Sequence, residues 1–162
     1  MKNILKVAMV AGFAAVPMHA NAVTGDVQFN GTVTHTCVIN VGRQGTMVAD
    51  AAFQNLDSTN AGGQSGQAQI VATGNGFDVS IDVPAAFGTE PAADATAETF
   101  SGAYTTSGAT VTSGSAVGGA NSGAQNLSNG TTDVDINLAA AKAGADVFEA
   151  GNYVATVVLR CE

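Results

Sequence analysis

The sequence has little positive charge, few charged residues of either sign and no tryptophan. Its 162 residues hold five Lys and Arg against 13 Asp and Glu. Without a basic surface to neutralise phosphates, nucleic acid is a poor candidate partner, and an anionic membrane surface is disfavoured for the same reason. A hydrophobic content of 46% with only 11% charged residues is too apolar for a disordered chain. The 20 glycines, together with many Thr, Ser, Val and Asn residues, favour strands joined by turns.

The sequence also lacks the motifs of catalysis. Beyond residue 22 the only histidine is His35, and Cys37 is the only nearby residue that could share a metal ion with it. No nucleophile elbow, phosphate-binding loop or dinucleotide-binding glycine pattern occurs. The carboxylate pairs are Asp78 with Asp82 and Asp133 with Asp135. They lack the spacing of a calcium loop and are interpreted as solvated strand faces. We therefore expect no enzyme, no catalytic residue, no metal site and no cofactor.

The first 22 residues have the pattern of a secretory signal peptide. Lys2 and Lys6 form a positive region, Val7–Val16 is apolar, and Pro17 precedes the small-x-small sequence Ala20–Ala22. The apolar stretch is too short to cross a bilayer of roughly 30 Å as a helix. Cleavage after Ala22 predicts an exported protein of 140 residues, the remainder of 162 after 22. Only three cations then face the 13 carboxylates, a net charge of −10.

Export places the two cysteines in an oxidising compartment, where a disulfide is expected. A bond between Cys37 and Cys161 would close 124 residues of chain, the difference of their numbers. In the chain-entropy model such a bridge stabilises the fold by about 4–5 kcal/mol. The alternatives are two free thiols or a bridge between two chains.

Alternating apolar and polar residues predict half-buried antiparallel strands over Phe77–Val83, Val134–Leu138 and Tyr153–Cys161. Weaker strand signals occupy Ala68–Thr73, Glu98–Thr105 and Ala109–Ser113. The only helical evidence, Leu138–Ala145, is too short for a stable helix and is interpreted as a connecting turn. Ser107–Thr131, rich in small and polar residues, is either a hairpin region with long loops or a flexible insertion. About seven short strands favour an all-β antiparallel sandwich.

A further alternation, Val23–Val33, opens the exported chain and contains no proline. The same pattern serves two structures. It fits an ordinary first strand of a complete domain, and it fits a strand that pairs with the sheet of another molecule.

Three segments share patterns with one known protein family. Val27–Ile39 carries F-x-G-x-V shortly before Cys37, and alternating apolar residues follow Gly151–Tyr153 near the C-terminus. With Ile70–Ile81 between them, these segments resemble the amino-terminal region, the closing strand and the second and third strands of chaperone–usher pilins, most closely of their archaic, spore-coat-U-like branch. The resemblance covers both ends and part of the middle, and Phe87–Thr131 shows none.

The resemblance implies an immunoglobulin-like sandwich that is incomplete and is completed by a donor strand from the next subunit. It divides the chain into a signal peptide (1–22), a donor-strand segment (23–36) and a pilin-like domain (37–162). The implied donor residues are Val23, Val27, Phe29 and Val33, and the implied acceptor-groove residues are Tyr153, Ala155, Val157 and Leu159.

The function that the resemblance implies is a structural subunit of a surface fimbria that supports adhesion or biofilm formation. Its partners would be other pilin subunits, a periplasmic chaperone and an outer-membrane usher, and a host or abiotic surface is a further candidate. The protein would pass through the periplasm to the cell surface.

The cysteine pattern departs from many pilins, which pair the first cysteine with one at the end of the second strand. Here Thr73–Asn75 occupies that region and the second cysteine is Cys161. The departure leaves an alternative open: a self-complete exported β-sandwich that acts as a binding module or adhesin, with loops from Phe87–Thr131.

Overall fold

The structure is a computed structural model that describes residues 24–92, 94, 96–118 and 124–162. The expected signal peptide and Val23 lie outside these residues. The described residues contain ten strands and no helix. The strands are β1 (Cys37–Arg43), β2 (Val48–Ala49), β3 (Asn55–Asp57), β4 (Gly66–Ala72), β5 (Phe77–Asp82), β6 (Glu98–Gly108), β7 (Ser113–Val117), β8 (Gln125–Leu127), β9 (Gly130–Lys142) and β10 (Val158–Cys161). The expected all-β antiparallel class is confirmed.

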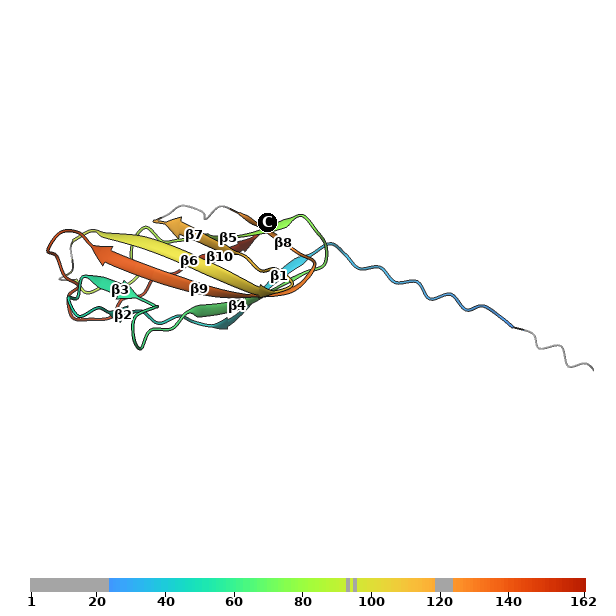
Figure 1. The fold of residues 1–162 in the computed structure, drawn as a ribbon, viewed down its shortest axis with the longest axis horizontal. Coiled ribbons are helices and arrows are strands. Elements are labelled where there is room, and N and C mark those ends of the chain that lie inside the picture. The colour runs from blue at the N-terminus through green and yellow to red at the C-terminus, as the bar shows by residue number, and fades with distance from the viewer. Residues whose placement is uncertain (1–23, 93, 95, 119–123) are drawn as a thin grey trace, which may run out of the picture. The chain divides into compact units, whose positions relative to one another are not determined.

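The strands form two antiparallel sheets (Figure 1). In the larger sheet β1 pairs with β4 and β4 with β9; the long strand β9 then pairs with β6 on its other side and with β3 near its end. β7 extends this sheet beyond β6, and β2 extends it beyond β3. The smaller sheet has the order β10-β5-β8.

Apolar residues from both sheets meet in one core. Ile70 and Val134 of the larger sheet and Val79, Ile81 and Leu127 of the smaller sheet are each no more than 1% exposed. Tyr104 of β6 joins the two layers, because its buried hydroxyl donates a hydrogen bond to the carbonyl of Val79 at 3.1 Å. The alternation read from β5 and β9 therefore marks the inward faces of a β-sandwich.

Two local expectations were wrong around the long strand. Leu138–Ala145 was expected to be a turn, but β9 continues through Lys142 because β3 and β6 flank it on both sides. Small alanine side chains permit that close pairing although alanine has a low strand propensity. Ala109–Ser113 was expected to be a strand, yet the chain turns here, with Gly108 at φ 91°, and β7 begins only at Ser113.

Two other strand expectations were corrected in part. The C-terminal strand was expected from Tyr153, but β10 begins at Val158, where pairing with β5 begins. Ser80 of β5 was expected on a wet face and is buried. Within Ser107–Thr131 the described residues form β7 and β8, which join different sheets. Among the residues described, none lies in a helix long and apolar enough to span a membrane.

Candidate functional site

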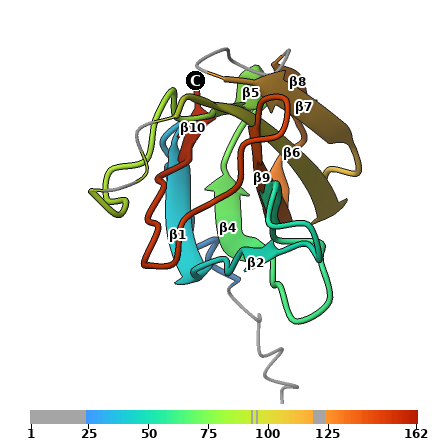
Figure 2. The same ribbon diagram turned by 90° about the vertical axis from the view of Figure 1, so that its left-hand side faces the viewer.

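Two strand edges lie close together on one side of the sandwich. Among the described strands, β1 pairs only with β4 and β10 pairs only with β5. β1 belongs to the larger sheet and β10 to the smaller one, and they approach each other at one end (Figure 2). An edge strand presents backbone N–H and C=O groups without ladder partners, so this side of the sandwich is open to a further strand.

A groove of about 1170 Å³ runs between the two edges. We call it the edge groove. One wall contains Ile39 and Val41 of β1, and the opposite wall is the segment Gly151–Leu159. Its remaining apolar lining comes from Met47, Leu56, Ala68, Ile136 and Leu138.

The four residues expected to form an acceptor groove all line the edge groove. Tyr153, Ala155, Val157 and Leu159 are half-buried and pack against the core cluster. The residues between them are exposed, so the predicted alternation of this segment holds beyond the strand itself. Whether these four side chains receive a donor strand stays a prediction.

The backbone of this wall is only partly paired. Val154 forms an isolated antiparallel bridge with Thr89, and its N–H donates to the Thr89 carbonyl at 2.9 Å. Residues 155–157 belong to no described strand or bridge. Extended backbone with alternate burial but without a strand partner along the groove is the local geometry that an added strand would complete.

The groove carries one charged side chain among its lining residues, Arg43. Its guanidinium donates hydrogen bonds to the Ser65 carbonyl, at 3.1 Å from Nη2 and 3.3 Å from Nε, and this keeps it at the end of β1. An occupant would therefore meet a mostly apolar surface with a cation at one end.

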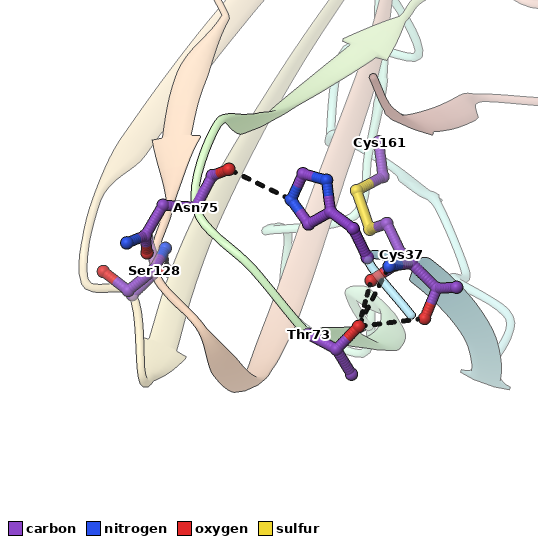
Figure 3. Close-up of a disulfide and its surroundings, with 8 residues drawn as sticks. Cys37, Thr73, Asn75, Ser128 and Cys161 are labelled. Atoms are coloured by element: carbon purple, nitrogen blue, oxygen red, sulfur yellow. Dashed lines mark hydrogen bonds between the residues drawn. A yellow bond between two sulfur atoms is a disulfide. The ribbon is translucent and has the colours of Figure 1, made fainter. Parts of the chain in front are cut away.

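A disulfide joins the two edge strands at the end of β1 opposite Arg43. Cys37 and Cys161 are bonded, with their Cα atoms 6.4 Å apart, so the expected intramolecular pairing is confirmed (Figure 3). The bond ties the first residue of β1 to the last residue of β10. A disulfide is compatible with an oxidising, exported environment.

Hydrogen bonds beside the disulfide attach the end of the expected donor segment to the domain. The Thr73 hydroxyl donates to the Thr34 carbonyl at 2.6 Å, and the Thr36 N–H donates to that hydroxyl at 2.9 Å (Figure 3). The His35 ring lies 4.5 Å from the ring of Phe77, centroid to centroid. His35 therefore has a packing role at this end of the sandwich.

The segment before these contacts is different. The described residues up to Thr32 form a unit separate from Val33–Glu162. Residues 24–32 contain no strand, and every one of them is exposed. Three of the expected donor residues are described: Val27, Phe29 and Val33 are 75%, 92% and 79% exposed. The fourth, Val23, lies outside the described residues.

The β1 wall of the edge groove and most of its floor were not expected from the sequence. The wall had a signal, because Ile39 and Val41 share the parity of Cys37. A register shift between Val41 and Arg43 ends this alternation. Nothing in the sequence indicated that Met47 and Leu56 would join them, because β2 and β3 are too short to show a periodicity.

Tyr153 connects the edge groove to a buried polar cluster. Its hydroxyl donates to Asp94 Oδ2 at 2.5 Å and lies 2.8 Å from the Glu149 carbonyl oxygen. Burial, followed by the hydrogen bond to Asp94, raises the pKa of Tyr153 above its ordinary value. The ring packs against those of Phe87 and Phe148, with centroids 5.0 and 5.3 Å away.

The described residues contain no group of three or more His, Cys, Asp or Glu side chains placed to hold a metal ion.

No protein-family model matches this chain, and no curated protein or solved structure matches it either.

Proposed function

We propose that this protein is a structural subunit of a surface fimbria and that its subunits join by donor-strand exchange. The edge groove is the observation that carries the proposal. It is an apolar groove between two strand edges of one domain, in a chain whose N-terminal segment has exposed, alternating apolar residues.

The strand order supports an immunoglobulin-like sandwich that lacks its last strand. In that fold one sheet has the order A-B-E-D and the other contains C, F and G, with F in the middle. Here the larger sheet contains β1-β4-β9-β6 and the smaller one contains β5 beside β10. With β1 as strand A and β10 as strand F, no described strand of this chain occupies position G beside β10.

An empty position G explains why the groove favours an occupant. Buried backbone groups without hydrogen-bond partners destabilise a domain. Apolar side chains that line an open groove stay in contact with water, so they do not contribute the free energy of burial. A strand that entered between β1 and β10 would pair with backbone and cover Val157, Leu159 and Ile39 together.

The N-terminal segment of a second copy has the properties of such an occupant. Val27, Phe29 and Val33 share one parity, so all three could enter the groove while the residues between them face water. Eleven residues from Val23 to Val33 reach roughly 37 Å, whereas the seven residues of β1 span roughly 24 Å. The segment is therefore long enough to run the length of the groove.

The remaining parts of the proposal follow from the resemblance to chaperone–usher pilins. Before assembly a periplasmic chaperone would cover the groove, and an outer-membrane usher would present the subunit to the growing fimbria. The assembled protein would lie on the cell surface and support adhesion or biofilm formation.

The decisive experiment gives the domain its own donor strand. A second copy of residues 23–33 is attached after Glu162 through a short glycine-rich linker. We expect this chain to accumulate in a periplasm without chaperone as a soluble monomer, with a higher urea midpoint than the parent chain. In the matched control the attached copy carries Val27→Asp and Phe29→Asp, and the gain should disappear.

Substitutions of two exposed valines, one in the N-terminal segment and one in the domain, test assembly itself. Val27→Asp in the N-terminal segment should abolish heat-sensitive, detergent-resistant polymers, which electrophoresis of unheated samples detects. Val111→Asp, at a residue that is 82% exposed in the domain, should leave them unchanged. If the parent chain is a stable monomer without chaperone and the attached strand adds nothing, the self-complete binding module is the better function.

A further inference from the structure

The strongest feature outside the edge groove is a buried lysine held between two carboxylates. Lys142 ends β9, and its Nζ lies 2.6 Å from Asp94 Oδ1 and 3.3 Å from Glu98 Oε2. The side chains of Lys142 and Asp94 are 0% and 1% exposed, and that of Glu98 is 7% exposed. Glu98 faces Lys142 directly across the β6–β9 pair, so the sheet itself fixes these two side chains.

Aromatic rings enclose the cluster. The Lys142 Nζ lies 5.0 Å from the centroid of the Phe148 ring, which in turn packs against Phe87 and Tyr153. Such a site excludes water and strengthens every electrostatic interaction inside it. Removing both charges from water costs free energy, and this cost offsets much of the attraction within an ion pair buried this deeply.

The two oxygens of Asp94 have different partners. Oδ1 accepts a hydrogen bond from the Lys142 ammonium, and Oδ2 accepts one from the Tyr153 hydroxyl. Burial disfavours the charged forms, but the hydrogen bond between them holds the pKa of Lys142 above and that of Asp94 below its ordinary value. The amine thus rests as an ammonium beside a carboxylate, with a second carboxylate in contact with the same nitrogen.

We propose that Lys142 and Asp94 condense to an intramolecular isopeptide bond and that Glu98 carries the proton that this reaction must move. The inference is independent of the fimbrial function, since it concerns the inside of one domain. The bond would join the end of β9 to the loop before β6.

The reaction balances with the groups present. A proton passes from Lys142 Nζ to Asp94 Oδ1 along their 2.6 Å hydrogen bond and leaves a neutral amine beside a carboxylic acid. The amine attacks Asp94 Cγ, a C–N bond forms, and the negative charge that develops on Oδ2 is stabilised by the Tyr153 hydroxyl. Glu98 takes a second proton from the nitrogen and gives it to Oδ1, which leaves as water when the C–O bond breaks.

Two physical effects favour the product. Contact between amine and carboxyl group in a fixed geometry replaces an encounter in solution, for which effective molarities reach about 10⁵–10⁸ M. The amide is neutral, so its formation removes two buried charges and their desolvation cost. No activating co-reactant is required, because water is the only molecule released.

Intact-mass measurement of the exported protein is the primary test. With the N-terminus established by sequencing and the disulfide counted, we expect a mass lower than the sequence mass by one water molecule. Cleavage after glutamates separates the peptide that ends at Glu98 from residues 99–149, and these two peptides should remain joined through Asp94 and Lys142. A full sequence mass, or a water loss within one peptide, overturns the proposal.

Variants assign the role of Glu98. Glu98→Gln keeps the size of the side chain but removes the proton acceptor, and it should lower the linked fraction about tenfold or more. Asp94→Ala should show the full sequence mass. Asp82→Asn, which alters the exposed ion pair with Arg160 elsewhere in the domain, should remain linked. If Glu98→Gln is linked as completely as the parent protein, the proton-carrying role is wrong.

Discussion

The two ends of the chain beyond residue 22 have the same sequence pattern and different structures. Thr24–Thr32 and Tyr153–Cys161 both alternate apolar and polar residues. Phe29 in the first segment is 92% exposed, whereas Leu159 in the second packs against the core. Strand periodicity states which side chains share a face, but it does not state which sheet covers that face.

The C-terminal segment is attached to the domain at several places, and the N-terminal segment has none of these attachments; two of them belong to β10. β10 pairs with β5 over four residues, and Cys161 is bonded to Cys37. If these attachments decide the difference, removing them should make the C-terminal segment behave like the N-terminal one. The following changes test that comparison on the donor-complemented chain, the protein with a second copy of residues 23–33 after Glu162.

Loss of the disulfide should have the largest effect. Replacing Cys37 and Cys161 by serine removes a bridge across 124 residues, so the free energy of unfolding should fall by about 4–5 kcal/mol. Urea unfolding measures this change. Treatment of the donor-complemented chain, with both cysteines present, with a reductant is the control and should give the same loss. An unchanged midpoint in both would show that pairing with β5 alone holds the C-terminal segment.

The second largest effect on the free energy of unfolding should come from truncating an apolar side chain, and it should differ between the two segments. Leu159→Ala removes a half-buried side chain from the core cluster and should cost about 2 kcal/mol of unfolding free energy. Phe29→Ala at its original position, before the domain, should cost almost nothing, because this side chain is exposed. Equal losses in urea unfolding would contradict the difference between the two segments.

A substitution on the polar face of the C-terminal segment should have the smallest effect on stability. Arg160 pairs with Asp82 and Glu162, but its side chain is 43% exposed. Surface ion pairs contribute about 0–1 kcal/mol, and salt screens them. Arg160→Ala should therefore shift the urea midpoint only slightly, and the shift should vanish in 1 M salt. A loss as large as that of Leu159→Ala would mean that β10 is held by its charges.

Much of the sandwich followed from the sequence because its residues form long periodic runs. β5 was expected within one residue of its end, and the centre of β9 was recognised from Val134, Ile136 and Leu138. The Ala-rich end of β9 was misread because strand formation there depends on β3 and β6, which come from distant parts of the sequence. The short strands β2 and β3 had no pattern to recognise.

The residues of the candidate sites likewise divide into those that a local sequence pattern predicted and those that it did not. The four expected groove residues are at one wall of the edge groove, because alternate positions of an extended segment necessarily share a face. The opposite wall and floor come from β1, β3, β4 and β9, which no local pattern brings together. The Lys142 cluster was not expected at all, since Asp94 and Lys142 are 48 residues apart.

By itself, the sequence determined the all-β class and the inward parity of the longer strands, and it favoured a bond between its only two cysteines. These are local properties or follow from composition, so no partner segment was needed to read them. Only the tertiary structure decided which edges remain open and which charges are buried together. Both depend on contacts between residues far apart in the chain, and a local sequence pattern does not indicate which distant residues meet.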